Sequence, residues 1–235
     1  MNNKYDNIKV IGFDADDTLW VNETYFRAAE EEVGKLLSHY ETPNKIDQEL
    51  FRIEIKNLPT YGYGVKGFML SMIELAIELS NGNVSNEIIS KMLDIGKDMI
   101  HKPIELLDGV EEVLKVLSKD YKLIVATKGD LLDQERKLEK SGLITYFHHV
   151  EVLSEKQEAN YEKLLKHLDI NPSEFLMIGN SLKSDILPLV NIGAEAIHVP
   201  FHTTWQHEKV TQQETNGAEY KTVKCLTEIL EYFTK

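Results

Sequence analysis

The chain has 235 residues, with 26 Lys and Arg against 39 Asp and Glu, which gives a formal net charge of −13. Such an acidic excess argues against a nucleic-acid partner, which would normally require a basic surface. Apolar residues make up 42% and charged residues 28%, which excludes disordered and collagen-like classes. Cys225 is the single cysteine, so an intramolecular disulfide and a cysteine-based zinc site within the chain are both excluded.

The distribution of apolar residues predicts no membrane-spanning segment and no secretory signal. The first nine residues contain no apolar stretch typical of a signal peptide, and no later apolar run approaches the roughly 20 residues that span a bilayer. We therefore expect a cytoplasmic protein without a membrane partner. The sequence gives no indication of the oligomeric state.

Short apolar runs alternate with helical patterns along most of the chain. The first run, 8–13, is followed by acidic residues. It is predicted to form a buried strand with polar groups at its carboxyl end. Similar runs recur at 121–126, 175–178 and 194–199, each flanked by apolar residues at helical spacing. This alternation predicts an α/β fold with a parallel, doubly wound sheet, which binds ligands at the carboxyl ends of its strands.

The stretch from Trp20 to Pro103 shows helical periodicity alone, and Pro103 marks a return to the alternating pattern. Its clearest segment carries an apolar stripe at i, i+3, i+4 and i+7, which is formed by Val65, Phe68, Met69, Met72, Ile73, Ala76 and Ile77. We therefore expect a core domain of residues 1–19 and 104–235, and an inserted all-α domain of residues 20–103.

Residues 62–67 of this insertion spell G-x-G-x-x-G, the dinucleotide-binding fingerprint. That fingerprint requires a preceding buried strand, whereas residues 50–58 are charged and helical in pattern, so we reject a nucleotide site. The loop instead suggests a substrate contact through Lys66, Tyr61 or Tyr63. A flexible turn is an equally good interpretation.

The strongest signal for chemistry is the run Asp14-Ala15-Asp16-Asp17-Thr18, directly after the first apolar run. Carboxylates this close repel one another unless a cation or hydrogen bonds offset the charge, and Mg²⁺ prefers oxygen ligands of this kind. Because strand side chains alternate between faces, Asp14 and Asp16 are expected on one side. A solvated acidic turn is the simpler alternative.

The sequence resembles the haloacid dehalogenase-like hydrolases. Their first motif, an apolar strand followed by Asp-x-Asp-x-Thr, matches Asp14, Asp16 and Thr18. Their second motif, a strand ending in Ser or Thr, matches the run that ends at Thr127, and their third matches Lys156 before a helical pattern. The fourth, Gly-Asp followed by a further Asp, is met in part by Gly179-Asn180 and Asp185.

This resemblance implies a phosphatase with Mg²⁺ as its cofactor, a helical cap and a small phosphorylated metabolite as its substrate. Asp14 would be the nucleophile, and Asp16 would act as acid and base. Thr127 and Lys128 would bind the phosphoryl group, and Lys156 would neutralise charge. The implied metal ligands are Asp14, Asp16, Asn180 and Asp185.

Each later motif also has a simpler interpretation. Thr127 could be a helix N-cap, Lys156 could lie on a solvated face, and Asn180 could cap the helix that follows it. Asn180 departs from the family pattern, which commonly has an acidic residue here. Because Asn removes one negative charge from the site, we expect weaker metal binding. Asp185 could bind the metal directly or through water.

Other reactions stay open at this stage. A metal-independent 2-haloacid dehalogenase does not need Asp16, which argues against it, whereas Asn180 argues weakly for it. Phosphoryl transfer between sugars, phosphonate cleavage and a non-catalytic binding module are further alternatives. We interpret His202 and His207 as parts of an ordered surface loop beside the active site rather than as a metal pair, because no third ligand cluster supports them.

Overall fold

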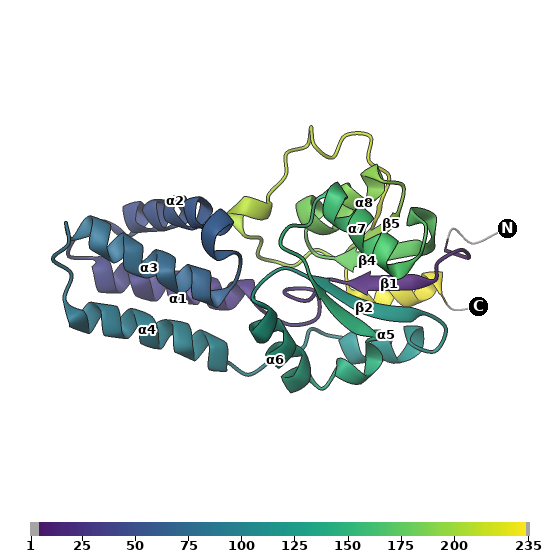
Figure 1. Ribbon diagram of the computed structural model, residues 1–235, viewed down its shortest axis with the longest axis horizontal. Helices are drawn as coiled ribbons and strands as arrows, with labels where there is room; N and C mark the ends of the chain where they lie inside the picture. Colours follow the sequence, from purple (N-terminus) through teal and green to yellow (C-terminus); the bar gives the residue numbers. More distant parts are fainter. Residues whose placement is uncertain (1–4, 234–235) are drawn as a thin grey trace. The chain divides into compact units, whose positions relative to one another are not determined.

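The computed structural model describes residues 5–233, which contain a six-stranded sheet in the order β3-β2-β1-β4-β5-β6. Every neighbouring pair of strands is parallel (Figure 1). The strands are β1 (Val10–Phe13), β2 (Lys122–Thr127), β3 (His149–Val152), β4 (Phe175–Gly179), β5 (Glu195–His198) and β6 (Lys221–Thr222). The predicted parallel α/β sheet is therefore confirmed.

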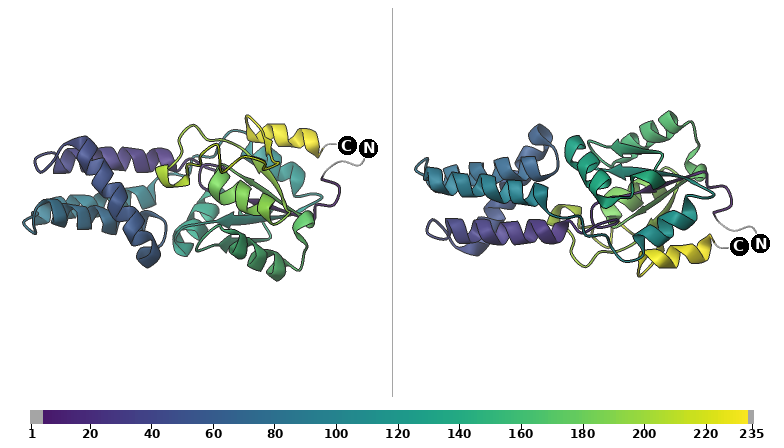
Figure 2. Two further views of the ribbon diagram at one scale, coloured as in Figure 1. Left: turned by 90° about the horizontal axis from the view of Figure 1, so that it is seen from above. Right: turned by 90° about the horizontal axis from the view of Figure 1, so that it is seen from below.

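Two apolar cores cover the two faces of this sheet, because successive side chains of each strand point to opposite sides. Ile11 and Phe13 of β1 pack with α5 (Val110–Leu117) and with the 3₁₀ helix η5 (Leu226–Tyr232). Val10 packs on the other face with α7 (Glu158–Leu168) and α8 (Leu187–Asn191). Figures 1 and 2 show these helices on opposite faces, which makes the sheet doubly wound.

The helical insertion forms a second compact unit, made of residues Asn22–Pro103 together with Gly129–Gln134. Its helices are α1 (Glu23–Leu37), α2 (Pro43–Tyr61), α3 (Val65–Leu79) and α4 (Asn86–His101). They enclose a core of their own, and its fully buried members include Val33, Leu50, Met72 and Met92. No helix within residues 5–233 is long and apolar enough to cross a membrane.

The structure adds elements that the apolar runs did not predict. The short strands β3 and β6 lie at the two edges of the sheet, and their few residues are only half-buried or exposed, so they lack a continuous apolar run. The last helix of the described residues, η5, is a 3₁₀ helix rather than an α-helix. The G-x-G-x-x-G segment joins α2 to α3, with no strand before it.

The register of the central strands brings the predicted motifs together. Phe13 of β1 pairs with Val125 of β2 on one side and with Ile178 of β4 on the other. Asp14 therefore lies one residue after this paired position on its strand. Thr127 and Asn180 lie two residues after it on the neighbouring strands. All three strand ends meet at the carboxyl edge of the sheet, where open α/β sheets bind ligands.

Candidate active site

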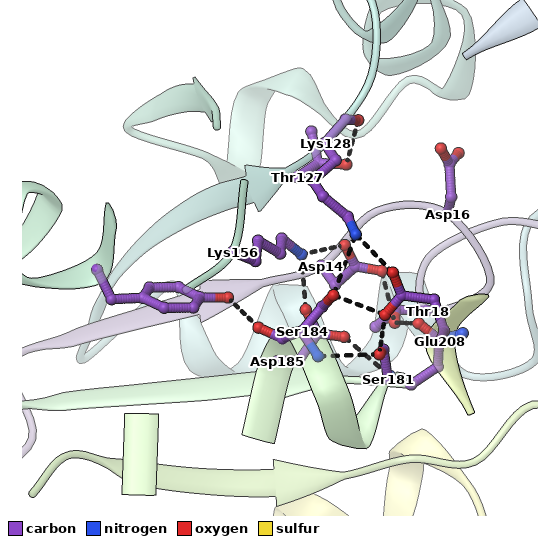
Figure 3. A network of polar contacts seen from close by, with 12 residues as sticks. Asp14, Asp16, Thr18, Thr127, Lys128, Lys156, Ser181, Ser184, Asp185 and Glu208 are labelled. Carbon is purple, nitrogen blue, oxygen red and sulfur yellow. Dashed lines mark hydrogen bonds and ion pairs between the residues drawn. The ribbon is translucent and has the colours of Figure 1, made fainter. Parts of the chain in front are cut away.

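Asp14 is held at the carboxyl end of the central strand by contacts from three sides. Its backbone N–H donates to the carbonyl of Ile178 at 2.9 Å, which continues the β1–β4 ladder by one residue. Lys156 Nζ lies 2.5 Å from Oδ1, and the Thr18 hydroxyl donates to Oδ2 at 3.2 Å. Only 7% of Asp14 is exposed, so these contacts fix a buried carboxylate at the sheet edge (Figure 3).

Lys156, which lies between β3 and α7, bridges two carboxylates. Its Nζ is 2.5 Å from Asp14 Oδ1 and 2.6 Å from Asp185 Oδ1, and its side chain is 1% exposed. Burial opposes the charged form of Lys156, but the two carboxylates raise its pKa well above the ordinary value. The ammonium is therefore a fixed positive charge beside Asp14.

Asp185 is engaged on both of its carboxylate oxygens. Oδ1 pairs with Lys156, and Oδ2 accepts the backbone N–H of Ser181 at 2.9 Å. A side chain at Gly179 would collide with this carboxylate, because a Cβ there would lie 2.3 Å from Oδ2. These contacts favour a role for Asp185 in holding Lys156, and its predicted role as a metal ligand stays a prediction.

The charge state of Asp14 follows from opposing effects. Burial raises the pKa of Asp14 to about 7, the neighbouring Lys156 acts in the opposite direction, and Asp185 adds to the rise. Without the ammonium, two carboxylates would lie together in a site almost closed to water. Lys156 therefore favours the ionised form of the Asp14 carboxyl group.

Asp16 has a different environment from Asp14. Its Oδ1 accepts the indole N–H of Trp20 at 2.7 Å and lies 2.9 Å from Lys137 Nζ. Figure 3 shows the Asp16 carboxylate apart from the network that surrounds Asp14. Asp16 is also more exposed than Asp14, with 26% of its side chain accessible, so it can exchange protons with a bound molecule or with water.

The oxygen atoms near Thr18 fit a hard divalent cation. Among residues 5–233 no group of three or more His, Cys, Asp or Glu side chains is placed to hold a metal ion, so a cation beside Asp14 needs a neutral oxygen as well. Asn180 Oδ1 supplies one, because it lies 3.4 Å from the Thr18 hydroxyl that bonds Asp14. A carboxylate and an amide oxygen are ligands that Mg²⁺ accepts.

Thr127 is the last residue of β2, and Lys128 directly follows the strand. Thr127 is buried and its hydroxyl lies 3.1 Å from the Lys128 carbonyl. Lys128 Nζ lies 3.0 Å from Ser184 Oγ and 2.6 Å from Glu208 Oε1. Figure 3 shows Asp14, Thr127, Lys128, Lys156 and Asp185 gathered at one edge of the sheet. Asn180 joins them through its contact with Thr18.

Lys66 belongs to the helical unit, where its Nζ lies 2.8 Å from Asp130 Oδ1 in a largely exposed ion pair. Its predicted contact with substrate stays a prediction. The residues His202 and His207 lie in the chain that follows β5, and their rings contact Phe201 and Trp205 respectively. Cys225 is exposed at the start of η5.

Sequence reasoning missed several residues of the network in Figure 3. Glu208 reaches it from the 3₁₀ helix η4 (Gln206–Glu208), and Tyr161 on α7 donates its hydroxyl to the Ser184 carbonyl at 2.9 Å. Ser181 and Ser184 complete the set. The signal for these serines was their position inside the fourth motif. Glu208 directly follows the loop of His202 and His207 that was expected beside the active site, but no periodic pattern singles it out.

Comparisons with known proteins identify the family of the chain. The model of the haloacid dehalogenase-like hydrolases matches residues 8–193, and the chain therefore belongs to that family of hydrolases. A crystal structure of a haloacid dehalogenase-like family hydrolase from Xanthomonas campestris is 36% identical, covers 96% of this chain and 92% of that chain, and superimposes with a TM-score of 0.84.

Two curated relatives carry more specific names. N-acylneuraminate-9-phosphatase from Mus musculus is 26% identical over 200 residues, which cover 80% of this chain and 81% of that protein. Pyrimidine 5'-nucleotidase PynA from Streptococcus pneumoniae is 32% identical over 114 residues, 43% of this chain and 48% of that protein. Both names describe enzymes that act on phosphate esters.

Proposed function

We propose that the protein is a Mg²⁺-dependent phosphatase that hydrolyses a small organic phosphomonoester through an aspartyl-phosphate on Asp14. The observation that carries this proposal is the buried carboxylate of Asp14, fixed at the carboxyl end of the central strand between Lys156 and Thr18. The phosphatase names of the curated relatives support the same reaction. The helical insertion would act as the cap that selects the substrate.

In the first step, an oxygen of Asp14 attacks phosphorus, and the bond between phosphorus and the ester oxygen breaks. Asp16 donates a proton to the departing oxygen, and the Trp20 N–H and the Lys137 ammonium stabilise the carboxylate that remains. Thr127 and Lys128 hold the phosphoryl oxygens. Proton transfer by such a group typically contributes about 10²–10⁴-fold to the rate.

In the second step, Asp16 takes a proton from water, and the resulting hydroxide attacks phosphorus and breaks the bond to Asp14. Inorganic phosphate leaves, and Asp14 regains its carboxylate beside Lys156. A Mg²⁺ ion held by Asp14, Asn180 and the backbone carbonyl of Asp16 would offset the negative charge of the phosphoryl group. Lys156 offsets that charge from its own position between Asp14 and Asp185.

The test compares the wild type with Asp14→Asn on p-nitrophenyl phosphate, with added Mg²⁺ and with EDTA. We expect hydrolysis by the wild type with Mg²⁺, its loss on chelation, and its loss in the variant, because the amide has no nucleophilic charge. Circular dichroism should show that the variant is folded. Near wild-type activity of Asp14→Asn would contradict the proposal.

A parallel assay of chloride release from 2-chloropropionate separates the main alternative. Dehalogenation uses an Asp nucleophile on carbon, so a dehalogenase would release chloride in the presence of EDTA. Chloride release without phosphatase activity would replace our proposal with that reaction.

A further inference from the structure

Glu208 lies outside the residues that match the family, yet its side chain reaches the candidate active site. The family match ends at residue 193, and Glu208 ends the 3₁₀ helix η4 in the chain that follows β5. Its Oε1 lies 2.6 Å from Lys128 Nζ. Its Oε2 accepts hydrogen bonds from the hydroxyls of Ser181 at 2.5 Å and Ser184 at 2.6 Å.

The pair formed by Lys128 and Glu208 is shielded from water. The two side chains are 15% and 12% exposed, respectively. Burial by itself would raise the pKa of Glu208, but Lys128 and the two serine hydroxyls together lower it to about 2. Glu208 is therefore an anion at any pH at which the enzyme is expected to work.

This degree of shielding sets the pair apart from an ordinary surface ion pair. Exposed pairs contribute little, because water and salt screen them and two long side chains lose freedom. Here two hydroxyls already fix the Glu208 carboxylate, so it offers Lys128 a partner that does not move. A lysine has a flexible stem, and such a partner determines where its ammonium lies.

Glu208 also contacts the turn that carries Asp185. Ser181 accepts the Ser184 N–H through its hydroxyl and donates its own N–H to Asp185 Oδ2. Asp185 then contacts Lys156, which contacts Asp14. One continuous set of polar contacts thus joins Glu208 to both ammonium groups of the site (Figure 3).

We propose that Glu208 is a positioning residue that holds the Lys128 ammonium at the carboxyl edge of the sheet, where it binds an anionic oxygen of the substrate. This inference rests on the proposed phosphatase function and adds a residue from beyond the family match. A carboxylate near a phosphoryl site repels the negatively charged substrate, so its position there calls for a compensating role. Holding Lys128 is the purpose that the contacts indicate.

The experiment uses Glu208→Gln, Lys128→Met and the double variant in the full chain. Glu219→Gln is the matched control, because Glu219 is exposed in the same stretch of chain and the substitution removes the same charge. For each protein we would measure kcat and KM on p-nitrophenyl phosphate with Mg²⁺. The dissociation constant of inorganic phosphate, measured by calorimetry, gives a readout that does not need turnover.

We expect Glu208→Gln to raise KM and the phosphate dissociation constant about ten- to hundredfold, with a smaller change in kcat, as is typical for partners of ligand-contacting groups. The double variant should bind phosphate no more weakly than Lys128→Met alone, because Glu208 acts through Lys128. Glu219→Gln should behave as the wild type.

Three results would overturn the inference. Tighter phosphate binding by Glu208→Gln would show that the carboxylate competes with the substrate instead of assisting it. Additive effects in the double variant would show that Glu208 acts without Lys128. A loss of binding matched by a drop in the thermal unfolding midpoint would assign Glu208 to stability alone.

The same data separate this inference from the proposed function. If the wild type does not hydrolyse the aryl phosphate but its phosphate binding depends on Glu208 through Lys128, the phosphatase proposal fails and the positioning role stands. If the wild type is active and Glu208→Gln matches it in KM and phosphate affinity, only the positioning role fails.

Discussion

Lys156 is the residue on which the charge balance of the site depends. Its nitrogen lies within 2.6 Å of both Asp14 and Asp185, and all three side chains are largely or fully buried. Removing one member of a buried set of charges leaves the others without a partner. The free-energy cost of this loss exceeds the net stabilisation that the intact set contributes. The position of Lys156 therefore matters for the charge state of Asp14 and for the stability of the sheet edge.

At Asp16 we predict that Asp16→Asn lowers kcat strongly on an unactivated alkyl phosphate, by roughly 10²-fold or more, while KM changes little. The amide cannot donate the proton that the departing oxygen needs, but the backbone carbonyl is retained. Steady-state kinetics on an alkyl and an aryl phosphate check this, since the aryl leaving group needs less protonation. A raised KM with unchanged kcat would assign Asp16 to binding.

At Asn180 we predict that Asn180→Asp lowers the Mg²⁺ concentration needed for half-maximal activity. A charged oxygen binds a hard cation more strongly than an amide oxygen, and Asn180 Oδ1 lies close to the Thr18–Asp14 contact. Turnover need not rise, because the added charge also repels the phosphoryl group. If the half-saturating concentration is the same in both proteins, Asn180 lies outside the metal shell.

Helices α1 and α2 hold a group of acidic side chains within the helical unit. Burial raises the pKa of Glu54 on α2 to about 8 and that of Glu30 on α1 to about 7. Glu23, Glu30 and Asp47 add to the rise at Glu54, and Arg27 opposes it, while Arg27 itself pairs with Glu23 and Glu30. A carboxyl with a raised folded-state pKa binds protons more tightly in the folded chain.

The stability that this proton contributes is complete below the unfolded pKa near 4.5 and is lost as the pH rises through about 8. We therefore predict that Glu54→Gln is more stable than the wild type at pH 9, by about 1–2 kcal/mol, and differs less at pH 5. Urea unfolding followed by circular dichroism at both pH values measures this.

Glu32→Gln provides the control for the Glu54 variant, because Glu32 lies exposed on α1 and the substitution removes the same charge. Its unfolding free energy should follow that of the wild type at both pH values. Equal stabilisation of the two variants at pH 9 would mean that the general negative charge of the protein, rather than the buried carboxyl, sets the pH dependence.

At the scale of the whole chain, the part of the fold that follows from apolar runs could be predicted from the sequence. The central strands β1, β2 and β4 are buried almost throughout and form apolar runs, and β5 is buried at its two middle residues. The edge strands β3 and β6 have no such run. Parallel order then brings Asp14, Thr127 and Asn180 to the same edge of the sheet without further information.

The remainder of the site depends on contacts that no local pattern encodes. Glu208 reaches Lys128 only because the chain after β5 returns to the strand ends, and this path has no periodicity. Lys137 contacts Asp16 from α6 (Leu131–Ser141). The amphipathic pattern of this helix predicts that its lysines lie on the polar side, but not which residue they contact. Such residues become visible only with the tertiary structure.

The helical unit includes Gly129–Gln134, which directly follow Lys128 in the chain, and Lys66 pairs there with Asp130. We predict that Lys66→Ala changes the ranking of phosphorylated substrates more than it changes stability or the Mg²⁺ requirement. An exposed ion pair contributes only about 0–1 kcal/mol, so its loss should leave the fold intact. A panel of phosphorylated metabolites, assayed with both proteins, measures the ranking.

Lys91→Ala is the control for Lys66→Ala, because Lys91 forms a similarly exposed ion pair with Glu87 on α4. It should leave the substrate ranking unchanged. If Lys66→Ala changes the rate on every substrate by the same factor, the loop between α2 and α3 is not a specificity element.

The central position of β1 has a consequence for the order in which the protein folds during its synthesis. β1 is made first, but its neighbours β2 and β4 are translated only after the whole helical insertion. The insertion has a core formed within its own residues, so it can fold on the ribosome while β1 still lacks partners. The sheet needs contacts between distant parts of the chain, which form slowly. We expect nascent chains that end before β4 to expose the apolar side chains of β1 and to depend on chaperones until Phe175–Gly179 emerges.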